Sequence, residues 1–150
     1  MGNKELEAGS DGEKTTYSVI SFPARALPES YRNMVYSKWK RSLKHGNDYF
    51  KLVESDAYYE AYDKYIRSLL GRANSVIRIA VLSDDRDVAL GWSLIEGDVL
   101  HYVHVTREQR NKGIATSLVP TQINYLTHLT KSGMSIWHNK LPKARFNPFL

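Results

Sequence analysis

Three β-rich segments joined by short acidic turns constrain the fold of this chain most strongly. They are Ser75 to Leu82, Val88 to Ile95 and Val99 to Val105, with Asp84 to Asp87 and Glu96 to Asp98 as the turns between them. β-branched and aromatic residues favour strands, and turns of this length join antiparallel neighbours. The segments therefore predict an antiparallel three-stranded meander.

Signals on either side of the meander predict a mixed α/β (α+β) fold. Before it, Tyr17 to Phe22 predicts a first strand, and apolar residues at helical spacing predict helices over about 27–43 and 56–70. After it, we expect a helix from Gly113 to about Lys131 and a strand from Met134 to His138. The expected order is β-α-α-β-β-β-α-β, a mainly antiparallel sheet flanked by helices.

Composition limits the number of domains and the available chemistry. The 150 residues are 42% apolar and 25% charged, which is typical of one globular domain, here expected over residues 16–150. Residues 1–15 are polar and predict a disordered N-terminal tail rather than a signal peptide. The chain has no Cys, which excludes disulfides, thiolate metal sites and a cysteine nucleophile. No apolar run approaches the roughly 20 residues of a membrane helix, so we expect a cytoplasmic protein.

The formal net charge of +5 favours an anionic partner, such as a nucleotide-like cofactor, nucleic acid or an acidic protein. The same charge is also common in small domains for solubility alone. Five basic residues fall in the first predicted helix: Lys38, Lys40, Arg41, Lys44 and His45. They would favour an acidic or nucleic-acid-linked substrate, or they form a solvated helix face.

The segment from Val103 to Thr116 carries the strongest functional signal. A β-branched strand runs into a short basic loop, which ends in Arg-x-x-Gly-x-Ala at residues 110–115 and opens a predicted helix. Free backbone N–H groups and a helix N-terminus at one point favour an anion such as phosphate. The alternative is that Gly113 only opens a helix and that Arg110 and Lys112 are solvated.

This segment resembles the signature of the GNAT superfamily of acyl-CoA-dependent N-acetyltransferases. Arg110, Gly113 and Ala115 match its Gln/Arg-x-x-Gly-x-Gly/Ala positions, and Val103 and Val105 match the strand before it. The resemblance implies transfer of an acetyl group from acetyl-CoA to an amine, by direct attack in a ternary complex. The residues implied to bind acetyl-CoA are Val103, Val105, Arg110, Asn111, Lys112, Gly113, Ile114, Ala115, Thr116 and Asn139.

The resemblance also implies which groups bind the pantetheine arm, stabilise the oxyanion and protonate the leaving thiolate. The strand with Val103 and Val105 would splay from its neighbour and pair with the pantetheine arm, and the Val103 N–H would stabilise the oxyanion. Asn139 matches an asparagine of a second motif that touches pantetheine. No Tyr follows Tyr125 to act as the usual general acid, which leaves Ser135 and His138 as substitutes.

A base must deprotonate the amine, and in the family it commonly comes from the strands before the cofactor loop. Glu96, Asp98 and His101 are the candidates, of which Glu96 and His101 are our predicted catalytic residues. The two-residue period of a strand places His101 on the face of Val103. The alternatives are a solvated turn for Glu96 and Asp98, and a buried structural role for His101. His104 faces the other way, so we predict no metal site.

The resemblance weakens toward Leu150, because only twelve residues follow His138 and two of them are proline. The final helix-strand-strand of the family is therefore expected to be missing, which exposes a sheet edge. A homodimer, or docking on a larger protein, would cover that edge. Pro120 should kink the helix that contains it.

Two further functions compete with the enzyme. One is an inactive accessory or assembly protein of this fold, of a kind that a virus could encode, which binds CoA or a protein partner. The other is a nucleic-acid-binding module that uses the basic helix, although no recognised motif supports it.

Overall fold

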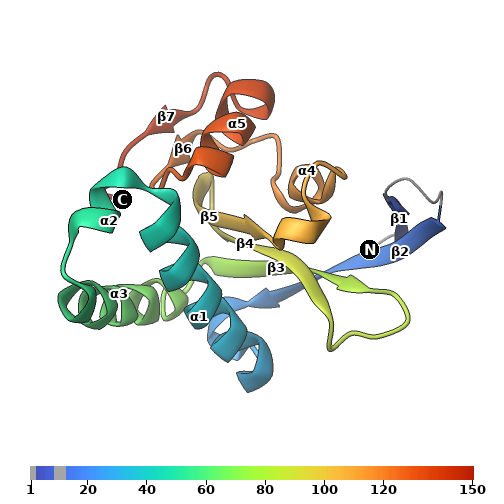
Figure 1. The fold of residues 1–150 in the computed structure, drawn as a ribbon, viewed down its shortest axis with the longest axis horizontal. Coiled ribbons are helices and arrows are strands. Elements are labelled where there is room, and N and C mark those ends of the chain that lie inside the picture. The colour runs from blue at the N-terminus through green and yellow to red at the C-terminus, as the bar shows by residue number, and fades with distance from the viewer. Residues whose placement is uncertain (1–2, 9–12) are drawn as a thin grey trace.

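The described part of the chain, residues 3–8 and 13–150 of a computed structural model, forms a sheet of seven strands (Figure 1). In sheet order these are β1 (Asn3–Ala8), β2 (Glu13–Pro23), β3 (Ser75–Leu82), β4 (Ala89–Glu96), β5 (Val99–Val105), β6 (Tyr125–Leu126) and β7 (Arg145–Phe146). Neighbours from β1 to β5 are antiparallel. The pairs β5–β6 and β6–β7 are parallel.

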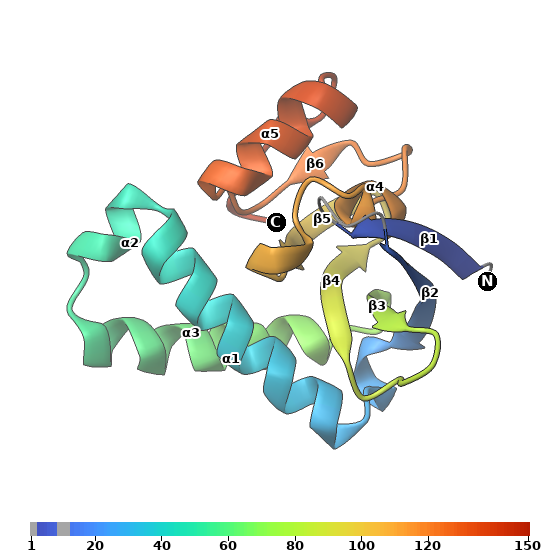
Figure 2. The same ribbon diagram turned by 45° about the vertical axis from the view of Figure 1, so that its right-hand side comes forward.

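Helices cover both faces of the sheet (Figure 2). They are α1 (Glu29–Gly46), α2 (Asp48–Leu52), α3 (Ser55–Leu70), α4 (Ile114–Leu118) and α5 (Lys131–Lys140). The helices α1 and α3 lie on one side, whereas α4 and α5 lie on the other. None of the helices in the described residues is both long and apolar enough to cross a membrane.

The hydrophobic core has a part on each face of the sheet. Trp39 of α1 and Ile66 of α3 are fully buried against Trp92 of β4 and other residues of the first face. On the second face, Ile114 and Leu118 of α4 are buried against β2, β3, β4 and β5. Because α4 contributes its apolar side to this core, the chain just before it is held at the end of β5.

The mixed α/β class and the antiparallel meander are confirmed, and β3, β4 and β5 follow the predicted segments closely. The two helices expected before the meander are α1 and α3. Alternating β-branched residues and tight turns specify these elements locally, so few distant contacts are needed to predict them.

The helix predicted from Gly113 to about Lys131 is wrong beyond its first turn, since α4 ends at Leu118. Val119 is extended, with φ −113° and ψ 115°. A residue before proline disfavours the helical conformation, so Pro120 ends the helix instead of kinking it. Ser93 Oγ donates to the carbonyl of Leu118 at 2.8 Å, which satisfies an acceptor that the helix end leaves open.

The strand predicted from Met134 to His138 is also wrong, because these residues belong to α5. The Thr130 side chain accepts a hydrogen bond from the Gly133 N–H at 3.0 Å and caps this helix. A helix and one short strand, α5 and β7, therefore follow β6 where the sequence predicted none. The edge strand β7 is two residues long and exposed.

The polar segment 1–15 was expected to be a disordered tail, but it contains strand β1. Its residues pair with β2 from Asn3 opposite Ser18 to Ala8 opposite Glu13. The described part of this segment is therefore paired with β2, and residues 1–2 and 9–12 lie outside the described residues.

Candidate active site

A cleft of about 630 Å³ opens between the end of β5, the loop after it and α5. We call it the β5–α5 cleft. Eight of the ten residues predicted to bind acetyl-CoA line it: Val103, Val105, Arg110, Asn111, Gly113, Ile114, Ala115 and Thr116. The predicted residues Lys112 and Asn139 do not line it. The C-terminal end of α1 and the first turns of α5 complete its walls.

The strand β5 separates from its neighbour beside this cleft. It pairs with β6 only through Val99 and Leu100. On its other side, the Thr106 N–H donates to Leu90 O of β4 at 2.9 Å. Successive residues of a strand point their N–H groups in opposite directions, so the N–H groups of Val103 and Val105 point away from β4. These two amides therefore face the side on which β5 has lost its strand partner.

The loop between β5 and α4 presents a row of free backbone amides. No described residue accepts a hydrogen bond from the N–H groups of residues 111–116. Asn111 and Gly113 are in the left-handed region, with φ 63° and 82°. A side chain at Gly113 would meet no atom within 4 Å, so open space lies in front of its backbone. Amides turned outward in this way form an anion-binding concavity.

The charges around the cleft differ in part from those predicted. Arg110 Nε donates to Val105 O at 3.1 Å, so this side chain also ties the loop to the end of β5. Lys131 at the start of α5 adds a cation that the sequence prediction missed. Lys140 donates to the Thr116 carbonyl and joins α5 to α4. With only five residues, α4 contributes a weaker dipole than the long helix that the sequence predicted.

The substitutes for the missing tyrosine acid both belong to α5. Ser135 lines the β5–α5 cleft and accepts a hydrogen bond from Asn139 Nδ2 at 3.2 Å. Asn139 therefore contacts Ser135 in the cleft wall but does not itself line the cleft. His138 stacks on the ring of Trp137 and does not line the cleft.

The predicted catalytic residues Glu96 and His101 contact each other but lie outside this cleft. His101 Nε2 is 2.9 Å from Glu96 Oε1, and Arg72 Nη1 donates to the same oxygen at 2.8 Å. The expectation that His101 shares a face with Val103 is wrong. Leu94 pairs with Tyr102 and Ile95 with Leu100, so His101 is the extra residue of a β-bulge and is fully buried. A bulge shifts the alternation of side chains along its strand.

The hydrogen-bonded chain continues from His101 to a histidine that the sequence prediction missed. His101 Nδ1 is 3.0 Å from Thr127 Oγ1, which is 2.8 Å from His128 Nδ1. His128 went unnoticed because residues 127 and 128 were expected inside a long helix. We call Glu96, His101, Thr127 and His128 the polar chain.

Burial and hydrogen bonds set the charges of this chain. Burial, together with a smaller effect of the nearby His101, lowers the pKa of His128 to about 4. Burial also lowers the pKa of His101, against the raising effect of Glu96. Burial alone would raise the pKa of Glu96, but hydrogen bonds from His101 and Arg72 bring it below its usual value. At neutral pH the histidines are therefore neutral and Glu96 is ionised.

A second cleft, of about 450 Å³, lies on the other side of the segment 127–130. We call it the aromatic cleft, because five aromatic side chains line it: Tyr49, Phe50, Tyr62, Tyr65 and Phe146. His128 lines it as well. A narrow cavity of about 10 Å³ lies between the two clefts and is lined by His128, Val103 and neighbouring residues.

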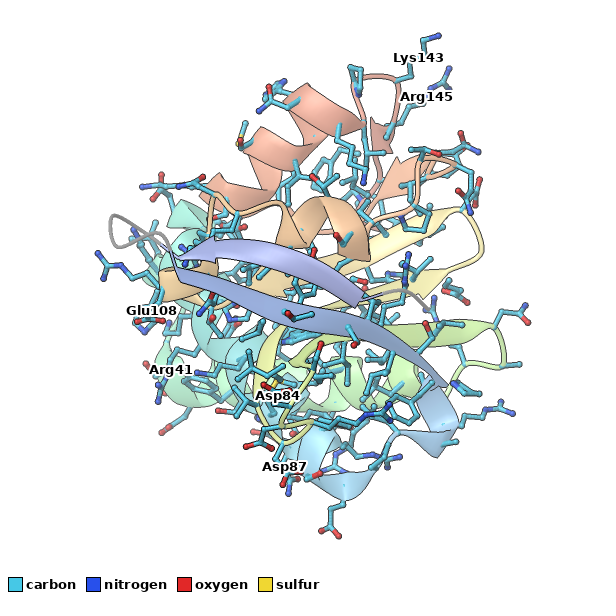
Figure 3. The ribbon with its side chains drawn as sticks, turned by 90° about the vertical axis from the view of Figure 1, so that its right-hand side faces the viewer. Arg41, Asp84, Asp87, Glu108, Lys143 and Arg145 are labelled. Atoms are coloured by element: carbon cyan, nitrogen blue, oxygen red, sulfur yellow. The ribbon has the colours of Figure 1, made fainter. Side chains whose placement is uncertain are left out.

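The basic residues of α1 do not form a uniform solvated face. Lys44 is only 8% exposed, and its Nζ donates to the carbonyls of Phe50 and Val53 at 3.0 and 2.7 Å. Figure 3 shows Arg41 far from the basic residues Lys143 and Arg145. Among the side chains that the structure describes, those of residues 16–150, no group of three His, Asp or Glu is placed to hold a metal ion.

Comparison with known proteins supports the architecture. A solved structure described as "Putative acetyl transferase from Pyrococcus furiosus" matches 87% of this chain and 80% of its own, with a TM-score of 0.52 and 16% sequence identity. The fold of this chain is GNAT-like. At this identity, the likeness establishes the fold and not the activity. No protein-family profile and no curated protein matches the sequence.

Proposed function

We propose that this chain is an N-acyltransferase that moves an acetyl group from acetyl-CoA to an amine in a ternary complex. The observation that carries the proposal is the row of free amides at residues 111–116, at the mouth of a cleft beside the unpaired end of β5. A phosphate-bearing ligand with an extended arm fits both features. The GNAT-like fold supports the same assignment.

In this proposal the amides of residues 111–116 hold the pyrophosphate, and Arg110 and Lys131 add positive charge. The open space at Gly113 admits the phosphates close to the backbone. The pantetheine arm lies along β5, where the amides of Val103 and Val105 can pair with it. Acetyl-CoA supplies an activated acyl group, and the Val103 N–H stabilises the charge that develops on its carbonyl oxygen.

Ser135 and the polar chain supply the remaining proposed roles. The Ser135 hydroxyl lies in the cleft wall, where it can donate a hydrogen bond to the departing thiolate. Glu96 and His101 stay candidates for removing the amine proton. Because neither lines the β5–α5 cleft, they act on the acceptor through Thr127 and His128 rather than directly.

Calorimetric titration of acetyl-CoA tests this proposal. Gly113→Glu places a carboxylate where the pyrophosphate is expected, which costs several kcal/mol and should weaken binding at least about 100-fold. Gly97→Glu is the matched control. Gly97 also has a positive φ, 60°, with nothing within 4 Å, but it lies in the β4–β5 turn and does not line the cleft. Both variants share the backbone strain of roughly 1–2 kcal/mol.

The proposal predicts binding by the parent chain and by Gly97→Glu, and loss of binding in Gly113→Glu. If the folded parent does not bind acetyl-CoA, the proposal is wrong. If both glutamate variants lose binding equally, the loss reflects strain and the assignment of the loop is wrong.

An inactive accessory protein of the same fold is the second candidate. Two observations favour it: α5 contains no tyrosine, and the edge strand β7 is short and exposed. This candidate predicts CoA binding without thiol release for any amine, and a dimer or complex in sedimentation experiments. Turnover with an amine would exclude it.

A further inference from the structure

We propose that the aromatic cleft binds the acceptor, an amine on an aromatic group without an acidic substituent, and that His128 passes its proton to Glu96. This inference rests on the proposed function and names the substrate class of the same site.

The position of His128 brings the two clefts together. Thr127, His128 and Leu129 line the aromatic cleft, whereas Thr130 lines the β5–α5 cleft. The narrow cavity between them, about 10 Å³, touches both His128 and Val103. A space of this size holds at most about one water molecule. An amine nitrogen in this space would meet both His128 and Val103 of β5.

The lining of the aromatic cleft selects the kind of amine. None of its twelve described lining residues is Asp, Glu, Lys or Arg. The Asn47 side chain is already occupied, because it accepts from Tyr49 N–H and Phe50 N–H and donates to Leu129 O. A carboxylate in this cleft would lose its water without gaining a charged partner. An ammonium group is stabilised by aromatic ring faces, and a flat ring packs among them.

The hydrogen-bond chemistry of the polar chain has one consistent direction. Ionised Glu96 can only accept, so neutral His101 donates from Nε2 and must accept at Nδ1. Thr127 then donates to His101 Nδ1 at 3.0 Å, with the His101 carbonyl as a longer alternative acceptor at 3.3 Å, and accepts from His128 Nδ1–H. This order leaves His128 Nε2 as a proton acceptor, 3.5 Å from the Tyr62 hydroxyl in the aromatic cleft.

Proton transfer along this chain balances at each atom. The ammonium gives a proton to His128 Nε2, and the Nδ1 proton of His128 moves to Thr127 Oγ1. The Thr127 hydroxyl proton moves to His101 Nδ1, and the Nε2 proton of His101 moves to Glu96, whose side chain is 26% exposed and can release it to water. The freed amine lone pair then forms the C–N bond as the C–S bond breaks, and the second proton that the nitrogen loses goes to the departing CoA thiolate. The surrounding titratable groups are Arg72 beside Glu96, and Tyr62, Tyr65 and Tyr102 beside His128.

A pair of acceptors tests the substrate class. Thiol release from acetyl-CoA is measured with 2-phenylethylamine and with phenylalanine, which carries the same ring and adds a carboxylate. We expect kcat/KM to be at least about tenfold higher for 2-phenylethylamine. Tyr65→Leu should raise the KM for this amine about tenfold and leave the Kd of acetyl-CoA unchanged. Equal or faster turnover of phenylalanine overturns the substrate class.

The variant His128→Gln tests the role of the histidine. At pH 7 we expect kcat for 2-phenylethylamine to fall about 100-fold, with little change in KM or in the Kd of acetyl-CoA. The defect should shrink as the pH rises toward the pKa of the amine, because free amine no longer needs a base. His138→Gln, outside both clefts, is the matched control. A defect that is the same at every pH means that His128 is only structural and overturns its role.

Failure of this inference is distinguishable from failure of the proposed function. If acetyl-CoA binds to the parent and not to Gly113→Glu, but 2-phenylethylamine neither binds nor releases thiol, only the acceptor assignment is wrong. If acetyl-CoA does not bind, both are wrong.

Discussion

The two clefts meet at the same wall but are built differently. The β5–α5 cleft offers mainly backbone amides, whereas the aromatic cleft is lined by aromatic side chains. Backbone groups are present whatever the side chains are, so a loop geometry and an open glycine are enough to recognise phosphate. Side-chain recognition depends on which residues are present. In the proposed function, the first cleft binds the common cofactor and the second selects the acceptor.

Gly91→Ala should disturb the end of β5 that lines the β5–α5 cleft and have the largest effect on stability. A Cβ at Gly91 would lie 2.7 Å from the backbone oxygen of His104, which belongs to β5. Either the added methyl displaces β5 or the site remains strained, at a cost of about 1–3 kcal/mol in the free energy of unfolding. Urea denaturation measures this cost, and acetyl-CoA titration should show weaker binding.

Gly71→Ala is the control for this change. Gly71 ends α3 with φ −80°, and its Cβ would make only an ordinary contact of 3.4 Å. It should leave acetyl-CoA binding unchanged and alter stability by less than about 1 kcal/mol. Equal stability of the Gly91 and Gly71 variants would show that β4 and β5 are not closely apposed at this point.

Acid should destabilise the protein, because each cleft contains a half-buried neutral histidine. Burial lowers the pKa of His104, in the β5–α5 cleft, and of His128, in the aromatic cleft, each to about 4. The unfolded chain binds protons near pH 6.5, so stability is full above that pH and falls as the pH drops toward 4. Between pH 7 and 5 we expect a loss on the order of 1–2 kcal/mol for each histidine.

Urea denaturation at several pH values measures this loss. His104→Gln and His128→Gln should each remove part of the pH dependence, and the double variant should remove more than either. A pH dependence that neither variant reduces would contradict the burial of neutral histidines in the two clefts.

Thr130→Val should affect ligand binding in the two clefts differently, with a smaller loss of stability than the changes above. The change removes the hydroxyl that caps α5 and costs about 1 kcal/mol of stability. Because α5 lines the β5–α5 cleft and not the aromatic cleft, acetyl-CoA binding should weaken a few-fold, whereas the KM for 2-phenylethylamine should change less. A change in the KM of the amine alone would reverse the assignment of the two clefts.

The sequence predicts the parts of the fold that local pattern specifies. The segments of β3, β4 and β5 alternate and are separated by turn residues, and α1 and α3 show helical spacing. Most of the predicted cofactor residues line one cleft, because a strand, a glycine loop and a helix start are contiguous in the chain.

Other features depend on contacts between distant segments. Nothing in the sequence marks His101 as the extra residue of a bulge, and the pairing of β6 with β5 requires only two residues. Met134 to His138 is rich in apolar and aromatic residues and looks like a strand, but the cap at Thr130 starts a helix there. The aromatic cleft joins α2, α3 and the C-terminal segment, so its residues cannot be grouped without the fold.

The central claim is that acetyl-CoA binds in the β5–α5 cleft and the amine in the aromatic cleft. Its most direct test is an amide ¹H–¹⁵N spectrum of the labelled chain, titrated with acetyl-CoA and then with 2-phenylethylamine. The account predicts that acetyl-CoA shifts the amide signals of residues 111–116 and Val103, and that the amine shifts those of Tyr49, Phe50 and His128. Acetyl-CoA shifts confined to the aromatic cleft, or none at residues 111–116, would contradict the account.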